Sequence, residues 1–220
     1  MIRFVLAILC ATASIFPAAA QQPGATHQFK ALLMNGSPAG STDQCLIFSG
    51  NGTDKYPSRH NWGTGPYCGF PGGKDALLAN KQAVWTFTPI SDTENLYTIS
   101  NDSGPDGSQC LIFSGNGTDQ YPSRYNWGSG PYCGFPGGKD ALLANKQAVF
   151  RIEWVNGSQF IIKNAAPAGA PEQCLIFGGN GTEQFPSRYN WGSGPYCGFP
   201  GGKTALLDNK QAIFTFQVLN

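Results

Sequence analysis

Short runs of alternating apolar and polar residues recur along the chain and predict β-strands. Each unit begins with an apolar stretch, at residues 29–34, 97–100 and 160–163. A turn rich in Gly, Pro, Asn, Asp and Ser follows, and then Cys-Leu-Ile-Phe. Each unit ends on an aromatic alternation, at residues 84–87, 149–152 and 213–216. Because period-two alternation of β-branched and aromatic residues is typical of strands, the pattern predicts an all-β chain with four short strands per unit.

Residues 74–84 and their counterparts are compatible with two kinds of secondary structure. A helix is possible, since Ala, Leu, Lys and Gln favour it. The Ala-Leu-Leu-Ala run is short, however, and the aromatic stretches on either side alternate with period two. This favours a strand.

Internal repetition is the strongest signal in the sequence. A 39-residue block occurs at 44–82, 109–147 and 173–211. The first two copies differ only at Lys55/Gln120, His60/Tyr125 and Thr64/Ser129. The connecting segments 86–108 and 151–172, by contrast, share little. Repeats this similar imply three equivalent sites.

The repeat spacing predicts a single closed domain over residues 21–220. Three units, at about 27–90, 91–155 and 156–220, fill this range and leave no room for a second domain. Three units of four strands are what a β-trefoil requires. A three-faced β-prism is the main competing closed arrangement, whereas a solenoid would need distinct capping repeats.

The motifs of the middle unit resemble a known family. Tyr97-x-Ile99, Gln109-Cys110-Leu111 and Asn145-Lys-Gln147-Ala-Val-Phe150-x-Ile152 are similar to the repeats of ricin-B type β-trefoil lectins, which run from a Cys-Leu strand to a Gln-x-Trp strand. The resemblance implies a β-trefoil and carbohydrate binding. The chain departs from the family in its Gln-to-aromatic spacing, which is three residues at Gln82/Trp85, Gln147/Phe150 and Gln211/Phe214. It also carries Ile47, Ile112 and Ile176 where the family often has the Asp that holds a galactose-type sugar.

The cysteines and the N-terminus predict an exported protein. Residues 1–20 contain Arg3, an apolar run and a final Ala-Ala-Ala, the layout of a signal peptide. Without Cys10, six of the seven cysteines remain, in pairs that recur with the repeat. An even count in an exported chain indicates disulfides, and the repeat favours Cys45–Cys68, Cys110–Cys133 and Cys174–Cys197. The expected location is secreted, periplasmic or extracellular.

Composition and charge exclude several functions. Only 12% of residues are charged, and without Arg3 the basic and acidic residues number 13 each, so no nucleic-acid partner is predicted. His27 and His60 are the only histidines and the cysteines lack metal-ligand spacing, so no metal or cofactor is expected. No paired carboxylates or Ser/His/acid set recurs among the copies, which argues against an enzyme. No membrane insertion is predicted, because the single apolar run is short.

The long Gly- and Pro-rich loop at 49–75 and its counterparts are the predicted binding sites. Loops of this length are uncommon in compact domains unless they are functional or disordered, and here a disulfide holds the loop. Rings can stack on the apolar face of a sugar while acids, Arg and Asn pair with its hydroxyls. The candidate ligand-binding residues are Asp54, Tyr56, Arg59, Asn61, Trp62 and Tyr67 in the first copy, Asp119, Tyr121, Arg124, Asn126, Trp127 and Tyr132 in the second, and Glu183, Phe185, Arg188, Asn190, Trp191 and Tyr196 in the third.

These observations predict a secreted, non-catalytic lectin or adhesin whose partners are glycans or glycoconjugates. Two alternatives of other classes are a β-trefoil protease inhibitor and a structural coat or matrix protein, in which the loop rings form a small core of their own. Sequons for N-glycosylation occur at Asn35, Asn51, Asn101, Asn116, Asn156 and Asn180. The favoured interpretation of the Asn-Gly pairs among them is turn formation.

Overall fold

The computed structural model describes the chain in separate ranges. These are residues 27–35, 44–46, 59–60, 66–91, 95–104, 107–111, 124–125, 131–164, 173–175, 188–189 and 195–219.

Strands dominate the described residues. In chain order the strands are β1 (Phe29–Asn35), β2 (Gln44–Leu46), β3 (Arg59–His60), β4 (Trp85–Ser91), β5 (Leu96–Gly104), β6 (Gly107–Leu111), β7 (Arg124–Tyr125), β8 (Phe150–Asn156), β9 (Gln159–Asn164), β10 (Gln173–Leu175), β11 (Arg188–Tyr189) and β12 (Phe214–Val218). The predicted apolar stretches form β1, β5 and β9, and the aromatic alternations form β4, β8 and β12. The prediction of a β-rich chain is therefore confirmed.

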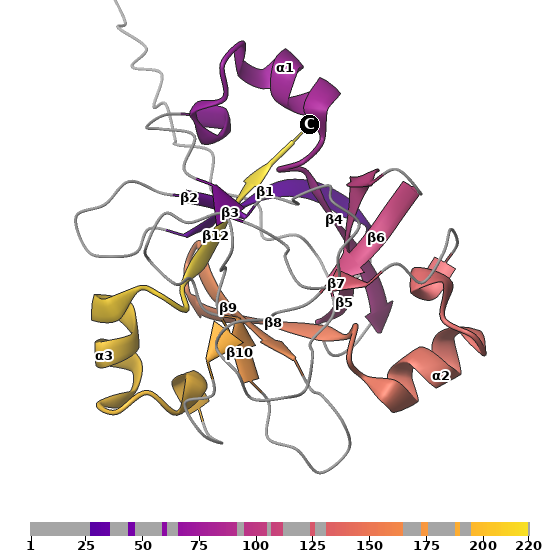
Figure 1. Cartoon of the computed structure of the whole chain (residues 1–220). Helices are drawn as coiled ribbons and strands as arrows, with labels where there is room; N and C mark the ends of the chain where they lie inside the picture. The colour runs from indigo at the N-terminus through magenta and orange to yellow at the C-terminus, as the bar shows by residue number, and fades with distance from the viewer. Residues whose placement is uncertain are drawn as a thin grey trace, which may run out of the picture.

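Six of the strands pair in a closed circuit. β1 pairs with β4 and β12, β5 pairs with β4 and β8, and β9 pairs with β8 and β12, always antiparallel. Three short hairpins, β2–β3, β6–β7 and β10–β11, join the circuit through β1, β5 and β9. Figure 1 shows these strands at the centre of the molecule, with the helices around them.

The circuit strands bury side chains on both faces. In β1, Ala31 and Leu33 join a central core to which β4, β5, β8, β9 and β12 also contribute. Leu32 and Met34 alternate with them and pack into a separate cluster outside the circuit. Because successive side chains of a strand point to opposite faces, one apolar stretch can serve both clusters. This double burial explains why β1 is apolar throughout residues 31–34.

The preference for a strand at residues 74–84 and its counterparts is wrong. Helices α1 (Gly73–Asn80), α2 (Gly138–Asn145) and α3 (Gly202–Asn209) occupy these segments. Each is preceded by a tight turn, η1 (Pro66–Gly69), η2 (Pro131–Gly134) and η3 (Pro195–Gly198). The period-two pattern begins only after a backbone turn that follows each helix, where Val84 N–H donates to Lys81 O. The fourth strand of each unit lies instead within the long loop, as β3, β7 and β11.

Candidate functional site

Three peripheral lobes carry the described part of the candidate sites. We define lobe 1 as residues 66–84, lobe 2 as 131–149 and lobe 3 as 195–213, so that each contains one tight turn, one helix and the turn that leads back into the strand circuit. In Figure 1 the three helices lie at well-separated positions around the strands. The lobes therefore repeat in space what the 39-residue blocks repeat in sequence.

A disulfide ties each lobe to its own short hairpin. Cys45–Cys68, Cys110–Cys133 and Cys174–Cys197 are bonded, and their Cα atoms lie 5.7–5.8 Å apart. The predicted connectivity is confirmed. Each bond closes the long loop of its unit, because one cysteine lies in the hairpin strand and the other in the tight turn.

A small apolar cluster lies beneath each lobe. In lobe 1, Leu77 packs with the Cys45–Cys68 disulfide, Val84 and the outward face of β1, while Tyr67 and Phe70 cover this cluster and stay partly exposed. Lobes 2 and 3 have equivalent clusters around Leu142 and Leu206. An eight-residue helix is too short to be stable alone in water, so docking on this cluster must hold it in place.

The tight turn before each helix has an unusual backbone. Tyr67 and Cys68 both adopt left-handed conformations, with φ of 56° and 59°, and the same pair recurs in lobes 2 and 3. The left-handed region costs a residue other than glycine about 1–2 kcal/mol. Phe70 N–H donates to Tyr67 O at 3.0 Å and closes the turn. The disulfide and this hydrogen bond hold a conformation that the two residues would otherwise avoid.

Glycines then redirect the chain into the helix. Gly72 has a φ of +93°, and a Cβ atom there would lie 2.8 Å from Cβ of Ala76. Gly73 follows with a φ of +67°. At the other end Lys81, with a φ of 64°, occupies the left-handed position after the helix that is usually Gly, and its N–H donates to Leu77 O. Lys146 and Lys210 do the same in lobes 2 and 3.

Most of the predicted ligand-binding residues lie outside the described residues. These are Asp54, Tyr56, Asn61, Trp62, Asp119, Tyr121, Asn126, Trp127, Glu183, Phe185, Asn190 and Trp191. The backbones of Arg59, Arg124 and Arg188 lie in β3, β7 and β11, opposite Leu46, Leu111 and Leu175 in the neighbouring strands. Tyr67, Tyr132 and Tyr196 are partly buried in the lobe clusters and keep part of each ring exposed. The structure thus gathers each tyrosine, disulfide and helix into one lobe.

The sequence analysis did not predict three buried asparagines, which lie at the ends of β1 and β9 and within β5. Asn35, Asn101 and Asn164 are each at most 2% exposed, and each side-chain amide donates to backbone carbonyls of a lobe. Two of them, Asn35 and Asn101, are also the asparagines of sequons. Each directly follows the predicted apolar stretch of its unit, and this shared position was a signal that could have found all three.

The described sequons differ in whether the asparagine side chain is accessible for glycosylation. An N-glycan is attached through the Asn side-chain nitrogen, which at Asn35 and Asn101 is enclosed and bonded to carbonyls. Asn156 is exposed at the turn between β8 and β9, where its amide contacts the side chain of Gln159. The folded chain is therefore incompatible with glycans at Asn35 and Asn101, and Asn156-Gly157 forms a turn as favoured from the sequence.

The described part of the lobes carries few charged side chains. Lys74, Asp75 and Lys81 lie on or beside helix α1, so both signs of charge are present. Among the described residues, no group of three His, Cys, Asp or Glu side chains could hold a metal ion. Within the same ranges no helix is both long and apolar enough to cross a bilayer. Burial raises the pKa of Tyr97, but this residue belongs to the central core and not to a lobe.

No protein-family model matches the chain, and a search of curated proteins found no relative.

Proposed function

We propose that the chain is an extracytoplasmic, non-catalytic carbohydrate-binding protein with a β-trefoil fold and three equivalent sites. The closed circuit of six strands with three attached hairpins supports the β-trefoil, because this fold consists of a six-stranded barrel and three hairpins. It also supports the kinship with ricin-B type lectins that the Cys-Leu and Gln-to-aromatic motifs imply. Three disulfides support an oxidising, extracytoplasmic location.

One observation carries the proposal. The disulfide-closed loop is nearly identical in three copies, whereas the connecting segments, which have the same structural task, have diverged. The cysteines, the glycines and the helix account for part of this fidelity through their roles in the lobe. They do not account for the Arg-Xaa-Asn-Trp run at Trp62, Trp127 and Trp191, which offers a ring and amide and guanidinium donors of the kind that bind a sugar.

The arrangement of the lobes supports multivalent binding. The helices of the three lobes lie at separate positions around one strand circuit, an arrangement that would let the chain engage several glycans on one surface together. Linked sites raise the overall avidity by orders of magnitude over the affinity of each site, without any new contact. Weak individual sites would therefore suffice for an adhesin.

A glycan array tests the proposal. We expect binding by the wild-type chain and loss of binding when Trp62, Trp127 and Trp191 are all changed to Ala, with circular dichroism and intact disulfides showing that the variant folds. A Trp154→Phe variant is the control, because it changes a tryptophan outside the lobes. Retained binding by the triple variant would contradict the assignment of the loops. If the wild-type chain binds no glycan but inhibits a secreted protease, the assignment as a protease inhibitor would be favoured over the assignment as a lectin.

A further inference from the structure

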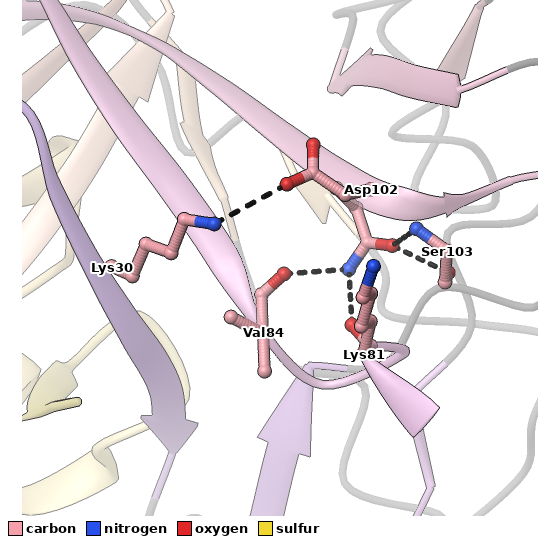
Figure 2. A network of polar contacts seen from close by, with 6 residues as sticks. Lys30, Lys81, Val84, Asp102 and Ser103 are labelled. Carbon is pink, nitrogen blue, oxygen red and sulfur yellow. Dashed lines mark hydrogen bonds and ion pairs between the residues drawn. The ribbon is translucent and has the colours of Figure 1, made fainter. Parts of the chain in front are cut away.

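Asn101 holds the exit of lobe 1 through an enclosed amide. Its Nδ2 donates to three backbone carbonyls, Lys81 O at 3.2 Å, Gln82 O at 3.1 Å and Val84 O at 2.8 Å. Its Oδ1 accepts from the backbone N–H and the hydroxyl of Ser103. Figure 2 draws the contacts with Lys81, Val84 and Ser103 as dashed lines. Both ends of the side chain are thus engaged, so its orientation is determined.

The carbonyls that Asn101 binds have a particular place in the lobe. They follow the C-terminus of helix α1, where carbonyl groups lack partners within the helix. Lys81 is the left-handed residue after the helix, and Val84 is the last residue before β4. Lys81 O also accepts from Val84 N–H, whereas the bond from Asn101 to Val84 O is buried. A buried carbonyl without a donor is costly, so the amide stabilises this turn in a single geometry. This turn sets the direction in which the chain returns from lobe 1 into β4.

The same arrangement occurs three times, and each time it crosses a unit boundary. Asn101 belongs to the second unit and holds lobe 1, and Asn164 belongs to the third unit and holds lobe 2 through Lys146 O, Gln147 O and Val149 O. Asn35, in the first unit, holds lobe 3 through Lys210 O, Gln211 O and Ile213 O. The strand register explains the crossing, because Asn101 lies opposite Trp85 and Asn164 lies opposite Phe150, the first residues of the strands that leave lobes 1 and 2.

We propose that Asn35, Asn101 and Asn164 are positioning residues for the lobes of the three candidate sites, and that the turn at the end of each lobe is held by the next unit in the circuit, whereas the disulfide ties the lobe to its own unit. No unit would then contain a complete site. Because the order is cyclic, lobe 3 depends on the first strand of the chain. Asn35 in that strand contacts Ile213, which lies 178 residues further along the sequence. The part of this inference that concerns ligand binding rests on the proposed function, whereas the part that concerns lobe order does not.

Hydrogen exchange on the full, disulfide-bonded chain tests lobe order. In Asn101→Ala we expect the amides of Lys81 and Val84 in lobe 1 to exchange about tenfold faster or more, while Lys146 and Val149 in lobe 2 keep the wild-type rate. Asn101→Asp should behave like Asn101→Ala, because it keeps the shape of the side chain but removes both N–H donors. Asn156→Ala is the matched control, since this asparagine is exposed and contacts only Gln159 among its described partners.

A second readout comes from the disulfides. Reduction by a phosphine followed by alkylation and mass spectrometry should show faster loss of Cys45–Cys68 in Asn101→Ala, with Cys110–Cys133 unchanged. Asn164→Ala should reverse this pattern. It is also the variant that best preserves the fold, because Asn164 Oδ1 has no hydrogen-bond partner among the described residues, so fewer contacts are lost.

The binding arm uses lactose and diacetylchitobiose as probes in native mass spectrometry. If a probe binds the wild type at three sites, Asn101→Ala should bind two. If neither probe binds the wild type, the proposed function fails for these sugars, and the exchange data still decide the positioning role. Faster exchange in lobe 2 instead of lobe 1, wild-type exchange in Asn101→Asp, or unfolding of the whole chain by both Asn101→Ala and Asn164→Ala would overturn the inference.

Discussion

Leu77 and Leu78 are neighbours on helix α1 with opposite environments, so truncating each of them isolates the contribution of burial to lobe 1. Leu77 is 1% exposed and packs in the lobe cluster, whereas Leu78 is 37% exposed. Both changes replace Leu by Ala in the same short helix, so their effects on helix propensity are nearly equal. The difference between the two variants therefore measures the docking of the helix.

The magnitude follows from the burial of Leu77. Burying a leucine side chain stabilises a protein by about 1.5–3 kcal/mol, and truncating a buried leucine to alanine costs about 2–5 kcal/mol once the cavity is included. Truncation of the exposed Leu78 should stay within about 0.5 kcal/mol. We expect the two variants to differ by at least about 1.5 kcal/mol in their free energy of unfolding. The equivalent pairs in lobes 2 and 3 are poorer tests, because Leu143 and Leu207 also pack against their clusters.

Urea unfolding followed by circular dichroism measures this difference. The unfolding midpoint should fall in Leu77→Ala and stay close to wild type in Leu78→Ala, with the slope unchanged if unfolding remains two-state. Hydrogen exchange at the Lys81 amide, which donates to Leu77 O, should rise in Leu77→Ala alone. Equal costs for the two variants would refute the idea that the helix is held by its buried leucine.

Three further predictions follow from individual side chains. Lys81→Gly should raise the free energy of unfolding by about 0.5–1 kcal/mol, because glycine relieves the left-handed backbone at a φ of 64° and loses part of that gain to chain entropy, and no gain in thermal melting would count against this strain. Changing Cys45 and Cys68 together to Ser should cost about 3 kcal/mol in urea unfolding, and a loss below about 1 kcal/mol would show that the disulfide does not brace lobe 1. Burial raises the pKa of Tyr97 above 10.0, so the unfolded chain loses this proton at a lower pH than the folded chain. The stability that Tyr97 contributes is complete below about pH 10 and is lost as the pH rises towards the folded-state pKa. Tyr97→Phe should remove this part of the stability loss when unfolding is measured at increasing pH.

The strands and disulfides were predictable because their signals are local or repeated. Alternation at residues 84–87 places Trp85 and Phe87 on one face, and both are buried in the central core. The recurrence of Cys45 and Cys68 in every copy left one economical pairing, which the structure confirms. The short strand at Arg59–His60, in contrast, has too few residues for a periodic pattern, so no alternation could reveal it.

The helices were mispredicted because the deciding interactions are not periodic. Within residues 74–84, eight-residue helix α1 buries only Leu77 fully, so its sequence carries almost no amphipathic pattern. Its start depends on the positive φ of Gly72 and Gly73, and its end on the left-handed Lys81. The propensities of Ala, Leu and Lys favoured a helix, but the period-two alternation of the flanking stretches was extended into this segment, and only the backbone conformations at its two ends show where the helix begins and ends.

The sequence by itself determined the threefold repetition, the strand alternation, the cysteine pairing and the near-neutral charge of this protein, because each of these can be counted along the chain. Tertiary structure decided that the lobes contain helices, and it decided which asparagine holds which lobe. Asn101 meets Val84 across 17 residues and Asn35 meets Ile213 across 178, contacts that exist only because β4 pairs with β5 and β12 pairs with β1. The sequence of nearly identical repeats cannot reveal this order, because it does not show whether an asparagine contacts the lobe of its own unit or that of a neighbouring unit.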